Sequence, residues 1–391
     1  MKTYCKGIDP SDVITIEQFI WECLQKKLKR KDYSEFAARY CNITAKEIRA
    51  NARSGLGYYT EMQLAVRNIA KDISLRIGQR ELQLEPIRYS KRTDGLSRKT
   101  RIIGIESVMQ QIMEHVAVGC MNELWAAKYE YHQYASIKNK GQLKGARTIL
   151  KWTKKGKTKY FVKLDVRKCF QSLTRETCMR LLQRDIGKNA VLLWFVDALL
   201  LMHGDGLVIG SLLSQFLCNY ILSYAYRYVM ALMKERRGKS VRLVSCALFY
   251  MDDVLLCGTD RRNLVMAVRK LVRYTQQFCL TVKSAWNVRK HTDCGIDMMG
   301  YVVKASGKIK VRRRIFIRAR RAFVRSAHGD DRMKVQRRVS AYYGFFKAAK
   351  IRKIELKQSA QNTMVINIQA IQAKASIMIG KEDRRNLPCA A

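Results

Sequence analysis

Helical and strand-like patterns of apolar residues alternate along the chain and predict a mixed α and β protein. Residues 1 to about 60 carry apolar positions at helical spacing. Residues 81–104 change to short basic strands and turns, and a helix is predicted from 105 to 126. The alternation over residues 159–166 predicts a buried strand that ends at Asp165.

The second half of the chain predicts a long helix followed by a hairpin. Charged residues in the last turn and a glycine stop predict that this helix runs from 211 to 237. Apolar runs at 241–250 and 254–258 predict two strands, with Met251-Asp252-Asp253 at the tip between them.

The pattern beyond this hairpin predicts more helix and a last strand pair. A helix is expected over 264–278, and a last pair of strands over 298–303 and 308–311 is expected to complete a sheet. Residues 312–357 are predicted to be helical.

Charge changes this picture more than any other bulk property. The 391 residues carry 75 Lys and Arg against 32 Asp and Glu, which gives a formal net charge of +43. Such an excess repels itself unless a polyanion neutralises it, and nucleic acid is the usual polyanion. A polybasic protein of the membrane surface is the other interpretation, but no amphipathic anchor or lipidation signal supports it.

Cysteines and the chain's apolar stretches give no sign of a secreted or membrane protein. The 12 cysteines are scattered without a CxxC pair or a histidine at ligand spacing, so no cysteine-based zinc site is expected. The N-terminus lacks the apolar core of a secretory signal, which favours the cytoplasm. Residues 206–226 are uncharged and long enough to span a membrane, but a polar stripe runs along them, at Ser211, Gln215, Asn219 and Ser223.

Two acidic positions are candidates for catalysis. Asp165 at a strand end and Asp252 at a hairpin tip would meet through sheet pairing and could hold two divalent ions about 4 Å apart. An all-oxygen site of this kind suits magnesium. The alternative is that Asp252 and Asp253 are ordinary turn residues.

The flanking residues favour catalysis, because they resemble a known family. Tyr250-Met251-Asp252-Asp253 resembles the palm signature of reverse transcriptases, and the run 163–170 (KLDVRKCF) resembles their preceding metal-binding motif. The resemblance extends over about residues 98–350 and implies an α+β right-hand polymerase. It implies an N-terminal helical extension at 1–60, fingers at 61–158, a palm at 159–305 with a finger-side insertion at about 175–205, and a thumb with a mobile C-terminal tail at 306–391.

The resemblance also implies roles for single residues. Asp165, Val166 and Asp252 correspond to metal-binding positions, and Asp253 to the less direct member of the acidic trio. Phe170 matches the aromatic gate that rejects a ribose 2′-hydroxyl, although plain core packing is the alternative.

Further matches concern the incoming nucleotide and the primer. The resemblance assigns the triphosphate grip to Arg98, Lys99 and Arg101, and the primer-grip turn to Met299-Gly300-Tyr301. Lys283 corresponds to a lysine proposed as general acid toward the leaving pyrophosphate. Without the resemblance, the first group reads as a solvated basic strand and Lys283 as a surface lysine.

One segment departs from the common pattern. Most reverse transcriptases have Gln-Gly before the helix that supports the templating base, whereas this chain has Ile209-Gly210 followed by Gln215. That pattern resembles the enzymes of diversity-generating retroelements of bacteria and phages, which copy a template RNA with errors at its adenines. Ile209 offers only apolar contact where Gln would form hydrogen bonds, so it is a hypothesis for a fidelity determinant. The alternative is that Ile209 merely packs under the helix, and Gly210 is expected to permit a close backbone approach to the nucleotide.

The sequence therefore predicts a reverse transcriptase that makes adenine-mutagenised cDNA with two Mg²⁺ ions, for which Mn²⁺ can substitute. The implied partners are template RNA, the RNA/cDNA hybrid, dNTPs and a small basic oligomeric helical accessory protein, with no membrane. Two alternatives stay open. One is another prokaryotic reverse transcriptase, of group II intron, retron or abortive-infection type, and the other is an inactive basic RNA-binding protein.

Overall fold

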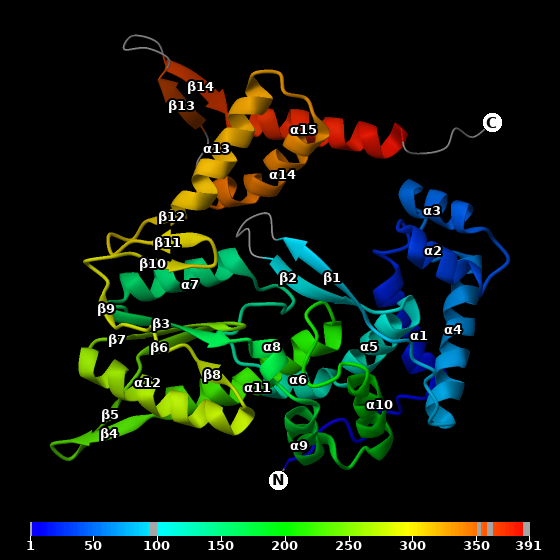
Figure 1. The fold of residues 1–391 in the computed structure, drawn as a ribbon, viewed down its shortest axis with the longest axis horizontal. Helices are drawn as coiled ribbons and strands as arrows, with labels where there is room; N and C mark the ends of the chain where they lie inside the picture. Colours follow the sequence, from blue (N-terminus) through cyan, green and yellow to red (C-terminus); the bar gives the residue numbers. More distant parts are fainter. Residues whose placement is uncertain (1, 94–99, 350–352, 358–362, 386–391) are drawn as a thin grey trace. The chain divides into compact units, whose positions relative to one another are not determined.

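The computed structural model describes residues 2–93, 100–349, 353–357 and 363–385 and mixes helices with short sheets, as predicted (Figure 1). The chain divides into two compact units. Unit 1 comprises Met1–Ser136, Lys163–Leu255 and Val265–Trp286, and unit 2 comprises Ile137–Val162, Leu256–Leu264 and Asn287–Ala391. The division does not test the predicted fingers, palm and thumb boundaries, which stay a prediction.

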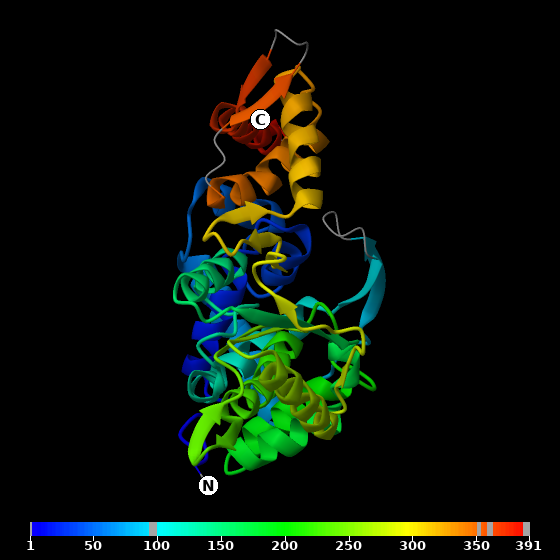
Figure 2. The same cartoon turned by 90° about the vertical axis from the view of Figure 1, so that its left-hand side faces the viewer.

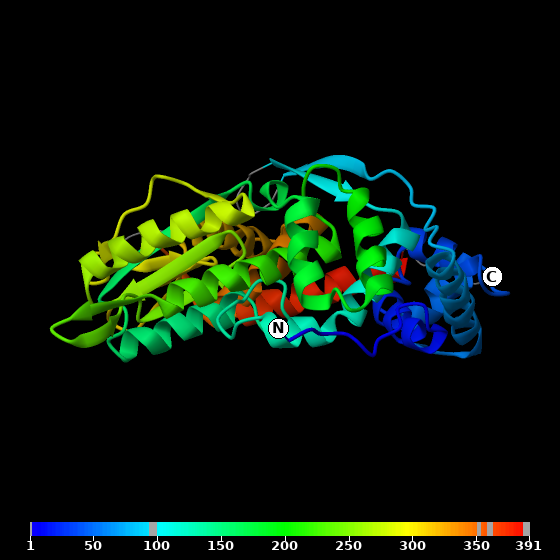
Figure 3. The same cartoon turned by 90° about the horizontal axis from the view of Figure 1, so that it is seen from below.

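Unit 1 begins with four helices: α1 (Val13–Leu24), α2 (Lys31–Ala38), α3 (Ala45–Ser54) and α4 (Thr60–Gly78). The Asp12 carboxylate caps α1 by accepting the N–H of Thr15, and Thr44 and Glu47 form a reciprocal capping box on α3. Figures 1 and 3 show α1 and α4 side by side, and α1 also packs on α5 (Val108–Cys120). The N-terminal helical prediction is therefore confirmed, and these helices belong to the core of unit 1.

A basic hairpin precedes α5, formed by β1 (Arg88–Thr93) and β2 (Thr100–Ile105) (Figure 2). The strands pair antiparallel and place Arg92 directly opposite Arg101. The helix predicted for 105–126 is interrupted, because α5 ends before Met121 and α6 (Asn122–Lys128) starts after it.

The central sheet carries the acidic positions. Its strand order is β6-β7-β3-β8, and β9 pairs with the start of β3. The bounds are β3 (Tyr160–Arg167), β6 (Cys246–Tyr250), β7 (Asp253–Gly258), β8 (Thr281–Val282) and β9 (Arg289–Lys290). Helix α11 (Leu212–Ala231) packs against β6 and α5, and α12 (Arg261–Thr275) follows β7.

Between β3 and α11 the chain forms three helices: α8 (Cys169–Ser172), α9 (Arg175–Ile186) and α10 (Ala190–Leu201). Figure 3 shows α9 and α10 side by side, in green. Asn189 caps α10 by accepting the N–H of Leu192, and its amide also donates to the carbonyls of Cys5 and Ile8. The N-terminal segment is thereby fixed to unit 1.

The end predicted for α11 is wrong. The helix stops at Ala231, and β4 (Met233–Arg236) and β5 (Lys239–Arg242) form a separate hairpin. Arg237 and Gly238 both have positive φ, 51° and 72°, which suits a two-residue hairpin turn. The charged residues at 234–237 favour a helix, but the chain forms a hairpin there because its turn residues adopt positive φ. The strand predicted over 241–250 is divided between β5 and β6.

Unit 2 contains α7 (Gln142–Lys154), which packs on a three-stranded sheet of order β10-β11-β12. These strands are β10 (Ile296–Met298), β11 (Tyr301–Val303) and β12 (Ile309–Val311). The predicted strand pair over 298–303 and 308–311 is confirmed in its pairing, because β11 pairs antiparallel with β12. Its first strand starts later than predicted, since Met299 and Gly300 have positive φ and form the turn between β10 and β11.

The C-terminal part of unit 2 is a group of three helices with a hairpin (Figure 2). Its elements are α13 (Arg313–Ala327), α14 (Met333–Ala348), β13 (Lys353–Lys357), β14 (Thr363–Asn367) and α15 (Ile368–Arg385). The helical prediction is wrong over Lys353–Lys357, where β13 pairs with β14.

The polar stripe on α11 lies inside unit 1. Ser211 donates to Glu114 Oε1, Asn219 Nδ2 donates to the Ala135 carbonyl, and Ser223 donates to the Tyr220 carbonyl, at 2.7, 2.9 and 2.6 Å. Three of its four side chains therefore bond to protein groups, and the fourth, Gln215, is half-buried. None of the helices in the described ranges is both long and apolar enough to cross a membrane.

Candidate functional site

Adjacent strands bring the two predicted acidic positions together. Asp165 lies near the end of β3, and Asp252 lies in the turn between β6 and β7, after Met251 with φ of 51°. The N–H of Val166 donates to the Asp252 carbonyl at 3.0 Å, which fixes the two chain segments next to each other. Asp253 begins β7 directly after them.

Lys283 contacts the first of these carboxylates. Its Nζ lies 2.7 Å from Asp165 Oδ1, and its backbone N–H donates to the Asp165 carbonyl at 2.9 Å. Both side chains are about half exposed, at 51% and 41%. The ammonium group of Lys283 therefore occupies a position next to Asp165 that would also attract a metal cation.

The pKa of Asp252 lies above its usual range. Neighbouring protein atoms displace part of its hydration, and the Asp253 and Asp165 carboxylates disfavour a further negative charge, whereas Arg101 acts in the opposite direction. The cluster therefore has more negative charge than its cations neutralise. Its oxygen-only donor set and this excess both fit a hard divalent cation.

The basic residue Arg101 lies on the exposed part of β2 opposite Arg92. Like charges directly opposite on paired strands are unfavourable, so a bound polyanion would stabilise this pair. The charge of Arg101 also reaches Asp252. The other two residues of the predicted grip, Arg98 and Lys99, lie outside the described residues.

Phe170 and Gln215 lie on helices that follow the strand end and the Ile-Gly segment. Phe170 is half-buried on α8, which starts after Lys168 in a left-handed conformation with φ of 45°. The Phe170 carbonyl accepts the N–H of Leu207 at 3.1 Å, so α8 is tied to the segment before α11. Gln215 is half-buried in the first turns of α11.

Ile209 and Gly210 dock onto strand β2. The N–H of Gly104 donates to the Ile209 carbonyl at 2.8 Å. Gly210 has φ of +122°, and a Cβ there would lie 2.5 Å from the Gly104 oxygen and 2.9 Å from Ile103 Cγ2. The close backbone approach that this glycine permits is therefore an approach to strand β2.

Gly210→Ala is expected to lower primer-extension activity at least tenfold and to destabilise unit 1. An added Cβ combines an unfavourable backbone conformation, which costs about 1–3 kcal/mol, with a clash against the β2 backbone. Steady-state extension rates and thermal unfolding measure the two effects. Gly204→Ala is the matched control, because Gly204 also has positive φ, +73°, but has nothing within 4 Å. Equal losses in the two variants would remove the clash as the cause.

The predicted primer-grip residues Met299, Gly300 and Tyr301 form the turn and first strand residue of the β10–β11 hairpin in unit 2. Met299 and Tyr301 are buried, and the Tyr301 ring packs on Phe345 with centroids 5.3 Å apart. Their side chains therefore stabilise unit 2, and Gly300 between them is buried as well.

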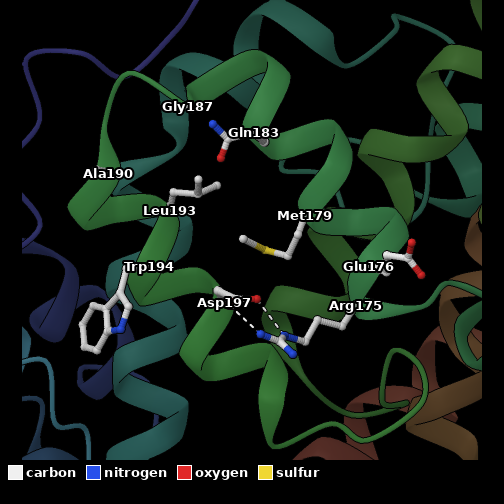
Figure 4. A pocket seen from close by; sticks show the side chains of 9 residues that line it. All are labelled: Arg175, Glu176, Met179, Gln183, Gly187, Ala190, Leu193, Trp194 and Asp197. Carbon is white, nitrogen blue, oxygen red and sulfur yellow. Dashed lines mark hydrogen bonds and ion pairs between the residues drawn. The ribbon is translucent and has the colours of Figure 1, made fainter.

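Two other features of unit 1 escaped the sequence analysis. One is a buried cluster of Glu106, Glu114 and His203, whose members lie far apart in the sequence and carry no motif. The other is a cavity of about 630 Å³ between α9 and α10 (Figure 4). Arg175 and Asp197 form a two-pronged ion pair at its edge, at 2.7 and 2.6 Å. The predicted site residues are not among those that line it.

The comparison with known protein families gives a match. No curated protein sequence matches the chain. The family model described as reverse transcriptase (RNA-dependent DNA polymerase) matches residues 89–303, which is more than half of the 391 residues. This range includes β1 from Tyr89 onward, the acidic strand ends and the hairpin at Met299-Gly300. The chain therefore belongs to the reverse transcriptase family and is an RNA-directed DNA polymerase.

Proposed function

We propose that this reverse transcriptase belongs to a diversity-generating retroelement of a bacterium or phage and makes adenine-mutagenised cDNA from a template RNA. Reverse transcriptases generally use divalent metal ions, and the proposed ions here are two Mg²⁺, for which Mn²⁺ can substitute. The catalytic part of the proposal rests on the adjacency of Asp165, near the end of β3, and Asp252, in the turn before the neighbouring strand β7. Ile209 carries the mutagenic part.

In the proposed mechanism, the Asp165 and Asp252 carboxylates hold the ions together with the Val166 backbone, and Asp253 adds negative charge beside them. When bound, the ions would activate the primer 3′-hydroxyl and neutralise charge on the transferring phosphate. Lys283 would leave Asp165 as the ions bind and would be free to protonate the leaving pyrophosphate.

The remaining residues of the site would position the nucleotide. Arg101, with Arg98 and Lys99, would bind the triphosphate, and Phe170 would exclude a ribose 2′-hydroxyl. Gln215 would lie beside the templating base, after Ile209 and Gly210. A fingers, palm and thumb arrangement follows from these roles. The basic face of the thumb is proposed to follow the duplex backbone, and its exposed arginines on α13 are Arg313, Arg314, Arg320, Arg321 and Arg325.

Ile209→Gln is expected to reduce misincorporation at template adenines about tenfold. A glutamine amide can donate and accept hydrogen bonds at the nascent pair, and one such contact is worth about 1–2 kcal/mol, or about tenfold per 1.4 kcal/mol. Deep sequencing of cDNA made from one RNA template measures the error rate at each base. Ile209→Leu is the matched control, because it keeps an apolar side chain, and its error rate should equal that of the unchanged enzyme.

The same sequencing experiment distinguishes the rival types. An unchanged enzyme that copies adenines as accurately as the other bases would contradict the retroelement proposal and favour a group II intron, retron or abortive-infection type. High adenine error that Ile209→Gln leaves unchanged would support the retroelement but remove Ile209 as its determinant. The proposed accessory protein, small, basic, helical and oligomeric, is supported by the family resemblance alone.

A further inference from the structure

Three buried side chains of unit 1 converge on one point away from the acidic strand ends. Glu106 follows β2, Glu114 lies on α5, and His203 follows α10. His203 Nε2 lies 3.4 Å from Glu114 Oε1 and 3.6 Å from Glu106 Oε1. The three residues are only 5%, 0% and 5% exposed, so water hydrates none of them appreciably.

Two atoms of this cluster lack a hydrogen-bond partner. They are Glu106 Oε1 and His203 Nε2, and both are completely buried. A buried polar atom without a partner is costly, and an ionised carboxylate is among the most costly groups to leave in this state. Both atoms point into the space that the three side chains share. Hydrogen bonds within the protein therefore leave these two buried atoms of the cluster without a partner.

The spacing of the three atoms fits a bound metal ion. Carboxylate oxygens and imidazole nitrogens bind zinc at about 2.0–2.2 Å, which places tetrahedral ligands about 3.3–3.6 Å from each other. The observed distances of 3.4 and 3.6 Å fall in this range and exceed a good hydrogen bond. Two of the three ligand separations therefore fit a tetrahedral site, and all three ligand atoms lie within 4.8 Å of one another.

The surroundings orient each ligand as metal sites require. His203 Nδ1 lies 3.4 Å from Ser214 Oγ, so it can donate its N–H there and leave the Nε2 lone pair for an ion. Glu114 accepts hydrogen bonds from Ser211 Oγ at 2.7 Å and from the N–H of Leu212 at 2.8 Å. These bonds hold Glu114 ionised and in one orientation.

We propose that Glu106, Glu114 and His203 bind one divalent transition-metal ion of the zinc type, as a structural site separate from the polymerase centre. Imidazole with carboxylates favours zinc-like ions, whereas the oxygen-only site at Asp165 and Asp252 favours magnesium. The net charge of two carboxylates and one such ion is zero, which suits a buried position. This inference does not depend on the proposed function.

The ion would add a further link among three segments that already contact one another. Glu106 comes directly after the finger strand β2, and His203 lies a few residues before Ile209-Gly210. Glu114 already caps the start of α11. A metal bond to all three would fix the segment that precedes α11 against the finger hairpin.

A bound proton is the competing explanation. Burial lowers the pKa of His203, but Glu106 and Glu114 outweigh it and raise that pKa to about 9. The pKa of Glu106 is raised to about 7, mainly by burial. Without metal, the cluster would hold a proton on the imidazole, so the experiment has to distinguish a proton from an ion.

The test measures metal on the full-length protein without a histidine tag. The protein is stripped with chelator, incubated with Zn²⁺ or Co²⁺, and desalted into buffer with excess Mg²⁺. We expect about one equivalent of zinc per chain and the visible d–d absorption of tetrahedral Co²⁺. The melting temperature should rise by roughly 5 °C when free zinc is about 100 times its Kd. His203→Gln and Glu106→Gln should lose the metal and the shift, and Asp252→Asn should keep both.

Three outcomes would overturn the site. The first is wild-type protein that holds well under one equivalent and shows no thermal shift, which assigns the cluster to a proton. The second is retention of zinc by folded His203→Gln or Glu106→Gln. The third is an intense thiolate-to-cobalt charge-transfer band, which would place the ion on the cysteines instead. If neither variant folds, the metal content and cobalt spectrum of the wild-type protein decide.

Discussion

Asp252→Asn is expected to lower primer extension on an RNA template on the order of 10³-fold, which corresponds to about 4 kcal/mol of transition-state stabilisation. The substitution replaces a charged side chain that is proposed to bind metal by a neutral one of the same shape, next to Asp165. Single-turnover extension with saturating primer, template and Mg²⁺ measures the loss. An activity within tenfold of the unchanged enzyme would contradict the proposed role of Asp252.

The same variant should be at least as stable as the unchanged protein when metal is removed. Because the folded-state pKa of Asp252 is raised, the folded chain binds the proton more tightly than the unfolded chain does. Above that pKa the ionised Asp252 carboxylate therefore lowers the free energy of unfolding, and the neutral Asn side chain does not. Thermal unfolding in chelator measures this, with Asp205→Asn, a change at an exposed acid, as the control. A marked loss of stability would mean that the activity loss reflects misfolding.

Asp185→Ala is expected to destabilise unit 1 by about 3–5 kcal/mol, because it leaves buried partners without their anion. The Asp185 carboxylate is fully buried and accepts hydrogen bonds from Tyr220 and Tyr224, both at 2.6 Å. Lys128 Nζ lies 2.8 Å away and Arg184 Nε 3.2 Å away. Denaturant unfolding measures the change in the free energy of unfolding.

Asp197→Ala is the matched control for this network. Asp197 also forms an ion pair with an arginine, but the two side chains are 31% and 41% exposed, so the pair should contribute about 0–1 kcal/mol. Comparable losses in the two variants would contradict the argument that burial makes the Asp185 network important.

Acid should weaken the Asp185 contribution over a defined pH range. Burial alone would raise the pKa, but hydrogen bonds from Lys128, Tyr220, Tyr224 and Arg184 outweigh it and lower the pKa to about 2. The stabilisation is therefore complete above the unfolded-state pKa of about 3.9 and is lost as pH falls toward 2, by roughly 2 kcal/mol. Asp185→Ala should show a flatter profile over this range.

The sequence predicted best those parts of the fold that local patterns determine. The strand ending at Asp165 and the hairpin around Asp252 each follow from a short run of apolar residues that ends in acids. Their adjacency follows from sheet pairing, so the candidate site could be assembled from two local signals.

The errors arose where long-range or turn geometry decided the outcome. The helix predicted to reach residue 237 is replaced by a hairpin whose turn residues, Arg237 and Gly238, have positive φ. Strand β13 alternates charged and apolar residues but is only five residues long, and its pairing with β14 comes from a later segment. Glu106, Glu114 and His203 meet only through tertiary packing, so no spacing in the sequence could have indicated them.

The hydrogen bond from Gly104 to the Ile209 carbonyl has a consequence for engineering this enzyme. The strand that carries Arg101 and the residue proposed to control copying accuracy share one backbone contact, so neither can be redesigned alone. A library that varies the hairpin to accept unnatural nucleotides should also change the error spectrum. Screening for both traits together would find combinations that separate selections discard.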